Sequence, residues 1–346
     1  MASAGIANCA PSCDAGNATF TPTVGRSTIE PSPAGLARWT PIRLDFSGPV
    51  PAVDWADLST ERFTDPFFDQ TVARWTADPH ARPVVTTGLD ELLALDDEPS
   101  LALAGMIFHL SRCGSTLVSR LLGILPGVVV LAEPAPLNAL LGLHPDRIED
   151  ATLARLVRAL VRALGRRRDE RHVVLKCTSW NIRRRAVLAA AFPDTPWTWV
   201  QRNPAHVLAS LLAKPPGWLG LQAAPRQAAL RFGLDPAAVG AMTRPEFAAA
   251  ALGAMLDAAA VDPARRLSVD YAELPAAVWQ RVAPHFGLEV DRAAIERMTN
   301  ESRFYAKDSA PRRFTGDGPE QQAVADAVRR AAQRFAEPGY RALSAR

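Results

Sequence analysis

Five small or polar residues, Arg112 to Thr116 (RCGST), interrupt an apolar part of the chain. A strand-like apolar run, Gly105 to Leu110, precedes them, and apolar residues recur at helical spacing from Leu117 to Leu125. A buried strand, a tight loop and a helix that begins with free N–H groups together form a binding site for an anion. Glycine lets the backbone approach a ligand, the hydroxyls donate, and arginine adds a permanent positive charge. Each charge-assisted hydrogen bond there contributes roughly 1.5–3 kcal/mol. We therefore predict an anion site formed by Arg112, Cys113, Gly114, Ser115 and Thr116.

Charged residues also close three further apolar runs. The pairs of run and closing residue are Val128–Ala132 with Glu133, His172–Leu175 with Lys176, and Trp197–Gln201 with Arg202. In a parallel sheet, ligands bind at the carboxyl ends of the strands, so these side chains are expected to gather beside the anion loop. Glu133 is a candidate general acid or base there. Its position equally suits an ordinary carboxylate at the end of a strand, and position alone does not decide between the two.

Helical patterns separate the apolar runs and predict the fold. The expected helices are Thr152–Leu164, Asn181–Ala191, one that begins at Asn203-Pro204 and carries Ser210, and Leu274–Phe286. Asn203 and Pro204 suit the N-cap and the first position of a helix. Leu267–Tyr271 is expected to be a fifth strand. Apolar strands that alternate with helices predict an α/β fold of three layers, α/β/α, with a central parallel sheet.

Three regions are expected along the chain. Residues 1–36 are rich in Ala, Ser, Thr, Pro and Gly and are predicted to be a disordered tail. Residues 37–100 are predicted to be an N-terminal extension that packs on the main domain, because aromatic residues are dense between Val53 and Trp75. Residues 101–346 are predicted to be the α/β domain, with a polar, basic loop at Thr299–Pro319 that is long enough to be a lid. Its last helix is expected at Glu320–Phe335.

Composition sets limits on class and compartment. The chain has 346 residues, 48% of them hydrophobic, and a formal net charge of +3, which implies no general polyanion partner. The arginines between Arg155 and Arg168 are expected to form a solvated face, since no aromatic residues alternate with them as nucleic-acid binding favours. The N-terminus lacks a secretory signal, and the longest apolar run, Leu121–Ala132, is too short to span a bilayer. We expect a cytoplasmic protein without a membrane span.

The sequence of the anion loop limits the range of ligands that it could bind. FHLSRCGSTLVSRLL, Phe108 to Leu122, lacks the first glycine and the lysine of the usual nucleotide-triphosphate loop. It resembles the phosphosulfate-binding loop of sulfotransferases, which use 3'-phosphoadenosine 5'-phosphosulfate (PAPS). A second landmark of that family is an arginine that closes a strand, then a proline and a serine; here it is QRNPAHVLAS, with Arg202, Pro204 and Ser210. Two supporting stretches, KCTSWNIRRRAVLAAAFPDTPWTWVQRNP and DYAELPAAVWQRVAPHFGLEVD, extend the resemblance from about Leu103 to Gly316.

The resemblance implies a P-loop nucleotide-hydrolase-like sulfotransferase fold and an enzyme that converts PAPS to 3'-phosphoadenosine 5'-phosphate (PAP). It implies that the loop holds the 5'-phosphosulfate and that Arg202 and Ser210 hold the 3'-phosphate. It further implies that Glu133 is the general base and that Lys176 and Arg112 stabilise the leaving charge. The reaction is expected to be in-line transfer to a hydroxyl or amine, with no metal, because side chains supply the cations.

The chain also departs from the family pattern. Cytosolic sulfotransferases place a catalytic histidine two residues after the strand-end lysine, where this chain has Thr178. Golgi-type and tyrosylprotein sulfotransferases instead have a glutamate shortly after the loop helix, a position that Glu133 matches in its "EP" context. The C-terminal R-K-G motif is not intact, and Arg312 and Arg313, which precede Phe314-Thr315-Gly316, are its nearest substitute.

Other functions stay open on the sequence alone. A P-loop kinase or nucleotide hydrolase would bind ATP with magnesium. A protein that keeps the fold without catalysis would bind PAP but turn over no acceptor, and a nucleic-acid binder would show strongly salt-dependent affinity. The acceptor, whether a small molecule, a glycan or a peptide, and the oligomeric state are not indicated.

Overall fold

The computed structural model describes residues 36, 39–78, 83–165, 170–304, 306–307, 312–313 and 325–344. The predicted tail lies outside these residues except for Leu36, which is buried. Most of the second half of the predicted lid and the start of the predicted last helix also lie outside them.

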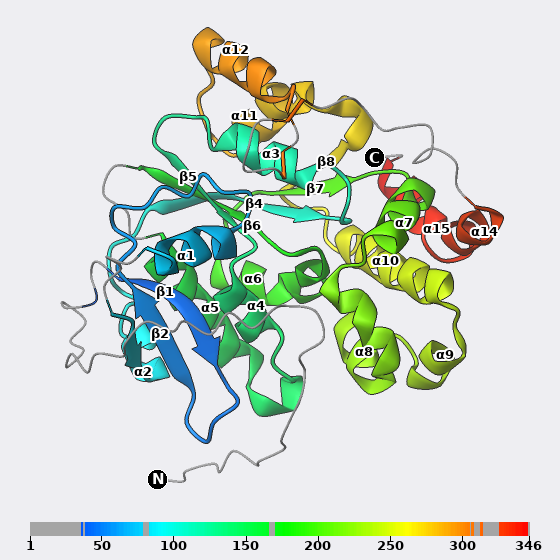
Figure 1. Ribbon diagram of the computed structural model, residues 1–346, viewed down its shortest axis with the longest axis horizontal. Helices are drawn as coiled ribbons and strands as arrows, with labels where there is room; N and C mark the ends of the chain where they lie inside the picture. The colour runs from blue at the N-terminus through cyan, green and yellow to red at the C-terminus, as the bar shows by residue number, and fades with distance from the viewer. Residues whose placement is uncertain are drawn as a thin grey trace.

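The strands are short and the helices are numerous (Figure 1). The strands are β1 (Thr40–Asp45), β2 (Ala52–Ala56), β3 (Val85–Thr87), β4 (Ala102–His109), β5 (Val128–Ala132), β6 (His172–Lys176), β7 (Trp197–Gln201) and β8 (Arg266–Asp270). The α-helices up to β8 are α1 (Phe68–Thr76), α2 (Leu89–Leu93), α3 (Ser115–Leu122), α4 (Ala135–Leu141), α5 (Asp150–Leu164), α6 (Arg185–Ala191), α7 (Pro204–Ala213), α8 (Pro225–Phe232), α9 (Pro236–Ala241) and α10 (Arg244–Ala260). After β8 come α11 (Ala283–His285), α12 (Arg292–Glu301), α14 (Asp326–Phe335) and α15 (Glu337–Ser344). Short 3₁₀ or π segments are η2 (Pro145–Arg147), η3 (Ser179–Arg184), η4 (Gly217–Ala223), η5 (Tyr271–Glu273) and η6 (Val278–Val282).

A five-stranded parallel sheet in the order β5-β6-β4-β7-β8 forms the centre of the molecule. Strands β5, β6 and β7 are mostly apolar and buried because helices cover both faces of the sheet, which is the usual reason for continuous apolar runs in parallel strands. Figure 1 shows α3 and α11 on one side of the sheet and α4, α5 and α6 on the other. The predicted α/β fold with a central parallel sheet is thereby confirmed.

The register of this sheet brings the strand ends together. Lys176, the last residue of β6, pairs with Ala132 of β5 on one side and with Ile107 of β4 on the other. His109, the last residue of β4, pairs with Val200 of β7. The residues that follow these ends therefore share one edge of the sheet.

The N-terminal region forms a second sheet, the antiparallel order β1-β2-β3. Trp55 of β2 is fully buried, and its indole N–H donates to Thr87 Oγ1 of β3 at 2.9 Å. β1 contacts α4 and α5, so this sheet packs on the helical layer beneath the central sheet. Between Val53 and Trp75, the aromatic residues belong to β2, to α1 and to the segment that joins them.

Several elements differ from the predicted ones. β4 begins at Ala102, three residues before the predicted strand. The predicted helix Leu274–Phe286 is present as a helical segment from Ala276 to His285, but its middle is the π turn η6, because Pro284 has no N–H for the helical hydrogen bond one turn back. α15, which was not predicted, follows the last helix and places Tyr340 Oη 2.8 Å from Asp270 Oδ2 at the end of β8.

The arginines of α5 do not form a wholly solvated face. Arg158 Nε donates to Asp96 Oδ1 at 2.7 Å, and Arg162 donates to the backbone carbonyl of Asp96. The acidic turn before β4 therefore covers part of this basic face. Among the helices within the described ranges, none has the length and apolar character needed to cross a membrane.

Candidate active site

The loop between β4 and α3 has an unusual backbone. Ser111, Arg112 and Gly114 have φ angles of 70°, 46° and 83°, in the left-handed region. Glu133, at the end of β5, has a φ angle of 55°. Within the described residues, these make three of the four non-glycine positions with positive φ, the fourth being Arg265. Backbone strain of this kind concentrates at functional sites, and here it lies at one edge of the sheet.

Gly114 is required by its surroundings as well as by its φ angle. A Cβ atom placed there would lie 2.6 Å from Leu274 Cδ1 and 3.0 Å from Tyr271 Cδ2. Gly114 is also the N-cap of α3, so it has no side chain that could accept from the first amides of the helix. Ser115 and Thr116 follow it at the buried start of α3. The start of this helix is thus available to an anionic ligand.

Cys113 anchors the loop instead of reacting. Its thiol is fully buried and donates to Val200 O of β7 at 3.1 Å, beside the Leu110 amide, which donates to the same carbonyl at 3.0 Å. Burial raises the pKa of the Cys113 thiol to about 11, so no thiolate forms at neutral pH. Only the backbone of Cys113 can contribute to ligand binding.

Glu133 and Lys176 form a buried ion pair across the ends of β5 and β6. Lys176 has no exposed side-chain surface and Glu133 keeps 21%, while the Glu133 amide donates to the Lys176 carbonyl at 2.7 Å. The ring of Phe67, just before α1, lies 5.1 Å from Lys176 Nζ. Burial tends to raise the pKa of Glu133, but Lys176 and His109 oppose this and hold that pKa well below its usual range.

His109 completes this cluster and was not predicted. Its Nδ1 accepts from the Ser111 amide at 3.0 Å, so in the neutral ring the proton is on Nε2. Nε2 lies 3.5 Å from Glu133 Oε1. Burial lowers the pKa of His109, with the charge of Lys176 acting in the same direction, although Glu133 opposes them. His109 is therefore a neutral side chain that faces Glu133 from the end of the central strand.

Arg202 and Tyr271 connect the loop to the other half of the sheet edge. The guanidinium of Arg202 lies 4.2 Å from the centre of the Tyr271 ring, and that ring packs against Gly114. Ser210 lies on α7, whose start is capped by Asn203 as predicted. Arg112 spans the same region, because its guanidinium donates to Lys214 O at the end of α7 at 2.7 Å. The predicted second site thus lies beside the loop.

The residues near the altered C-terminal motif are only partly brought to the site. Arg313 forms an isolated antiparallel bridge with Phe304, and both Arg312 and Arg313 are exposed. Lys307 was not predicted, yet it lies within electrostatic reach of Arg112 and Lys176. Burial, followed by these two cations, lowers the pKa of Lys307 to about 8. Its place in a polar, basic loop was the only signal in the sequence.

A cavity of about 210 Å³ lies beside the edge strand β5. Its walls come from the segment Phe63–Pro66, from Arg120 of α3, from Ala132 of β5 and from Glu301 of α12. Arg120 Nε donates to Glu301 Oε1, so the cavity is bordered by a bond between α3 and α12. Ala132 directly precedes Glu133 in the chain, although neither Glu133 nor Lys176 lines the cavity.

In chemical terms, the loop at the carboxyl ends of the strands has the donors to bind a tetrahedral anion, and cations lie close to it. Arg112, Lys176 and Lys307 lie around the loop, and Arg202 lies beyond Tyr271. Within the described residues, no group of three or more His, Cys, Asp or Glu side chains is placed to hold a metal ion.

No protein-family model matches the sequence, and no curated protein matches it. Solved structures of sulfotransferases are similar in fold. Sulfotransferase STF9 of Mycobacterium avium shares 14% identity over 72% of this chain and 79% of its own, with a TM-score of 0.43. Sulfotransferase STF1 of Mycobacterium tuberculosis H37Rv shares 16% identity over 72% of this chain and 79% of its own, with a TM-score of 0.39. The sulfotransferase domain of the Synechococcus PCC 7002 olefin synthase shares 17% identity over 69% of this chain and 89% of its own, with a TM-score of 0.35.

Proposed function

We propose that this chain is a cytoplasmic sulfotransferase that moves a sulfuryl group from PAPS to a hydroxyl or amine of an acceptor. The observation that carries the proposal is the position of Tyr271. Its ring packs against Gly114 of the loop and lies under the guanidinium of Arg202, so a single side chain separates the two predicted halves of the nucleotide site. The sequence motifs around both halves support the same ligand.

The residues present fit a nucleotide with phosphosulfate and 3'-phosphate groups. Gly114 allows the left-handed turn of the loop and its close packing against Leu274 and Tyr271, and the start of α3 offers amide and hydroxyl donors. Cations are close to the loop, and the planar guanidinium of Arg202, which lies over the Tyr271 ring, has the geometry that suits a second phosphate. The bound PAPS would supply an activated sulfuryl group.

The residues at the two parts of the strand ends then bind different groups of the nucleotide. Ser115 and Thr116 bind the 5'-phosphosulfate together with the loop amides, while Arg112 and Lys176 stabilise charge on the leaving phosphate oxygen. Arg202 and Ser210 bind the 3'-phosphate and so select PAPS over ATP.

The sequence predicted Glu133 as the general base, but the ion pair suggests a different task for it. It holds Lys176 in the buried position that the leaving group needs. A carboxylate with a pKa well below its usual range is a weak proton acceptor. Catalysis near neutral pH is therefore expected to need a second group with a higher pKa.

Calorimetric titration with PAP tests the proposal, with ATP and magnesium as the competing ligand. We expect PAP to bind with micromolar affinity and ATP to bind weakly. Arg202→Ala should weaken PAP binding by roughly 10- to 100-fold, because it removes charge-assisted hydrogen bonds worth roughly 1.5–3 kcal/mol.

Arg185→Ala is the matched control for this titration. Arg185 also stacks on an aromatic ring, that of Trp197 at 5.1 Å, but at the opposite end of β7. Its removal should leave PAP affinity unchanged. Binding of ATP in place of PAP would instead favour a kinase or nucleotide hydrolase, and PAP binding without turnover of any acceptor would indicate a non-catalytic binding protein.

A further inference from the structure

Asp69 lies in the first turn of α1, outside the region that the sequence motifs cover. Its Oδ1 accepts from the Ala135 amide at 3.3 Å, two residues after Glu133. The side chain remains accessible to solvent. A carboxylate from the N-terminal extension therefore reaches the same strand end as the Glu133–Lys176 pair.

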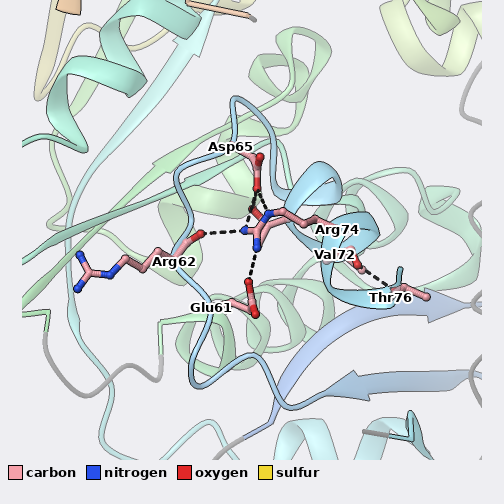
Figure 2. Close-up of polar contacts among 7 residues, drawn as sticks. Glu61, Arg62, Asp65, Val72, Arg74 and Thr76 are labelled. Atoms are coloured by element: carbon pink, nitrogen blue, oxygen red, sulfur yellow. Dashed lines mark hydrogen bonds and ion pairs between the residues drawn. The ribbon is translucent and has the colours of Figure 1, made fainter. Parts of the chain in front are cut away.

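The position of α1 is fixed by several bonds. Figure 2 shows Arg74 donating to Asp65, to the carbonyl of Arg62 and to Glu61. Thr71 Oγ1 donates to Asp65 Oδ2 at 2.9 Å. Because these contacts hold the preceding segment against the helix, Asp69 projects from a well-supported element.

The charges around Asp69 differ from those around Glu133. From the strand ends it is faced by Glu133, which is itself paired with Lys176 and lies 3.5 Å from His109 Nε2, while Asp65 and Arg74 on its own segment are paired with each other. Asp69 is exposed, but the surrounding protein atoms partly desolvate its carboxylate, and this raises its pKa to about 6; the bond from Ala135 opposes this shift, and the charge of Glu133 adds to it. Two neighbouring carboxylates with separated pKa values are a common arrangement for proton transfer.

We propose that Asp69 is the general base of the transfer reaction, and that Glu133 positions Lys176. This inference rests on the proposed function. Asp69 takes the proton from the acceptor hydroxyl as the acceptor oxygen forms its bond to sulfur. The bond between sulfur and the bridging oxygen breaks, its electron pair stays on the 5'-phosphate of PAP, and the proton later passes from Asp69 to water. The cavity beside β5, walled in part by Phe63–Pro66, the segment that precedes Asp69, is the space in which we place the acceptor.

The test uses Asp69→Asn, because asparagine still accepts from the Ala135 amide but cannot take a proton. PAP release from PAPS is measured with trifluoroethanol, whose hydroxyl is un-ionised, and with para-nitrophenol at about pH 8, where the phenol is already ionised. We expect Asp69→Asn to slow transfer to the alcohol by about 100-fold or more and to change transfer to the phenolate by less than about threefold. Asp235→Asn is the matched control, since Asp235 caps α9 through the Ala238 amide at 3.1 Å and lies outside the site.

A second measurement does not depend on turnover. The carboxyl carbon signal of Asp69 in a ¹³C NMR titration, assigned by its loss in Asp69→Asn, should titrate with a pKa of about 6. The rate of transfer to the alcohol should fall below the same pH in the unchanged protein, because only the ionised carboxylate accepts a proton.

The outcomes separate the two proposals. Intact PAP binding with an unchanged alcohol rate in Asp69→Asn overturns the role of Asp69 alone, as does titration near the ordinary aspartate value of about 4. An equal loss with both acceptors shows a structural role and also overturns it. If PAP binds but no PAP is released from PAPS with either acceptor, the site is not catalytic and both roles are overturned. If PAP does not bind, the proposed function itself is contradicted.

Discussion

The two halves of the strand-end edge handle charge differently. At the ends of β5 and β6, Lys176 is fully buried and bonded to Glu133. At the ends of β7 and β8, Arg202 stacks on the ring of Tyr271. One cation is compensated by an anion, and the other lies on an aromatic face.

Under the proposed function, this difference separates the side chains that act on the leaving group from those that bind the nucleotide. A lysine that is held by a carboxylate in a dry position can act on a leaving group without reorganisation. A guanidinium on a ring keeps the donors at its edge directed outward, which suits recognition of a phosphate. Substitutions in the first half should therefore change kcat, and those in the second half should change affinity.

Among substitutions along this edge, Lys176→Met should have the largest effect. We expect kcat for PAP release to fall on the order of 100- to 1000-fold, as when one donor to a developing charge is removed. Chemical denaturation should also show a loss of about 3–5 kcal/mol, because Glu133 keeps a buried, unpaired charge. Adding Glu133→Gln should restore much of the stability but not the rate; recovery of the rate would show that Lys176 serves only the fold.

Ser210→Ala tests the other half. Its hydroxyl is proposed to donate to the 3'-phosphate, so PAP affinity by calorimetry should fall about tenfold. The value of kcat at saturating PAPS should stay within about twofold. A large fall in kcat with unchanged affinity would contradict the division between the two halves.

Substitution of Lys307 should have the smallest effect, and Lys307 should make PAP affinity depend on pH. Its pKa is lowered to about 8, so it is protonated below that pH and neutral above it. PAP affinity should therefore fall about three- to fivefold as the pH rises through this value, the size expected for an accessible charge. Lys307→Met should remove that step and bind PAP more weakly at neutral pH. The same pH dependence in both proteins would exclude Lys307 as its source.

The central sheet could be predicted because apolar, β-branched strands that alternate with helices can be buried in few arrangements other than a parallel sheet covered by helices. The charged residues at the ends of β5, β6 and β7 could be found in the sequence for a related reason: a charged residue that closes an apolar run is easily recognised. The left-handed backbone of Ser111, Arg112 and Glu133 could not be predicted, since only glycine indicates such a conformation in a sequence.

The contacts of the N-terminal extension with the candidate active site could not be predicted from the sequence either. Asp69 reaches a backbone amide 66 residues away, and Phe67 reaches Lys176, so both contacts depend on how the extension packs. The density of aromatic residues predicted that this region packs on the main domain, but not which residues would be in contact. α15 was missed because Pro338 and Gly339 near its start are typical helix breakers, although proline is tolerated in a first turn.

The central position of β4 also has a consequence for the order of folding. The strand that leads into the anion loop pairs with β6 and β7, which begin at His172 and Trp197, and Tyr271, which packs on Gly114, comes later still. During synthesis, β4 must wait for these distant partners, since long-range parallel pairing is slow to form. The loop and its neighbours should thus be among the last parts of the molecule to assemble on the ribosome, and a nascent chain that has not reached Tyr271 should have no binding site.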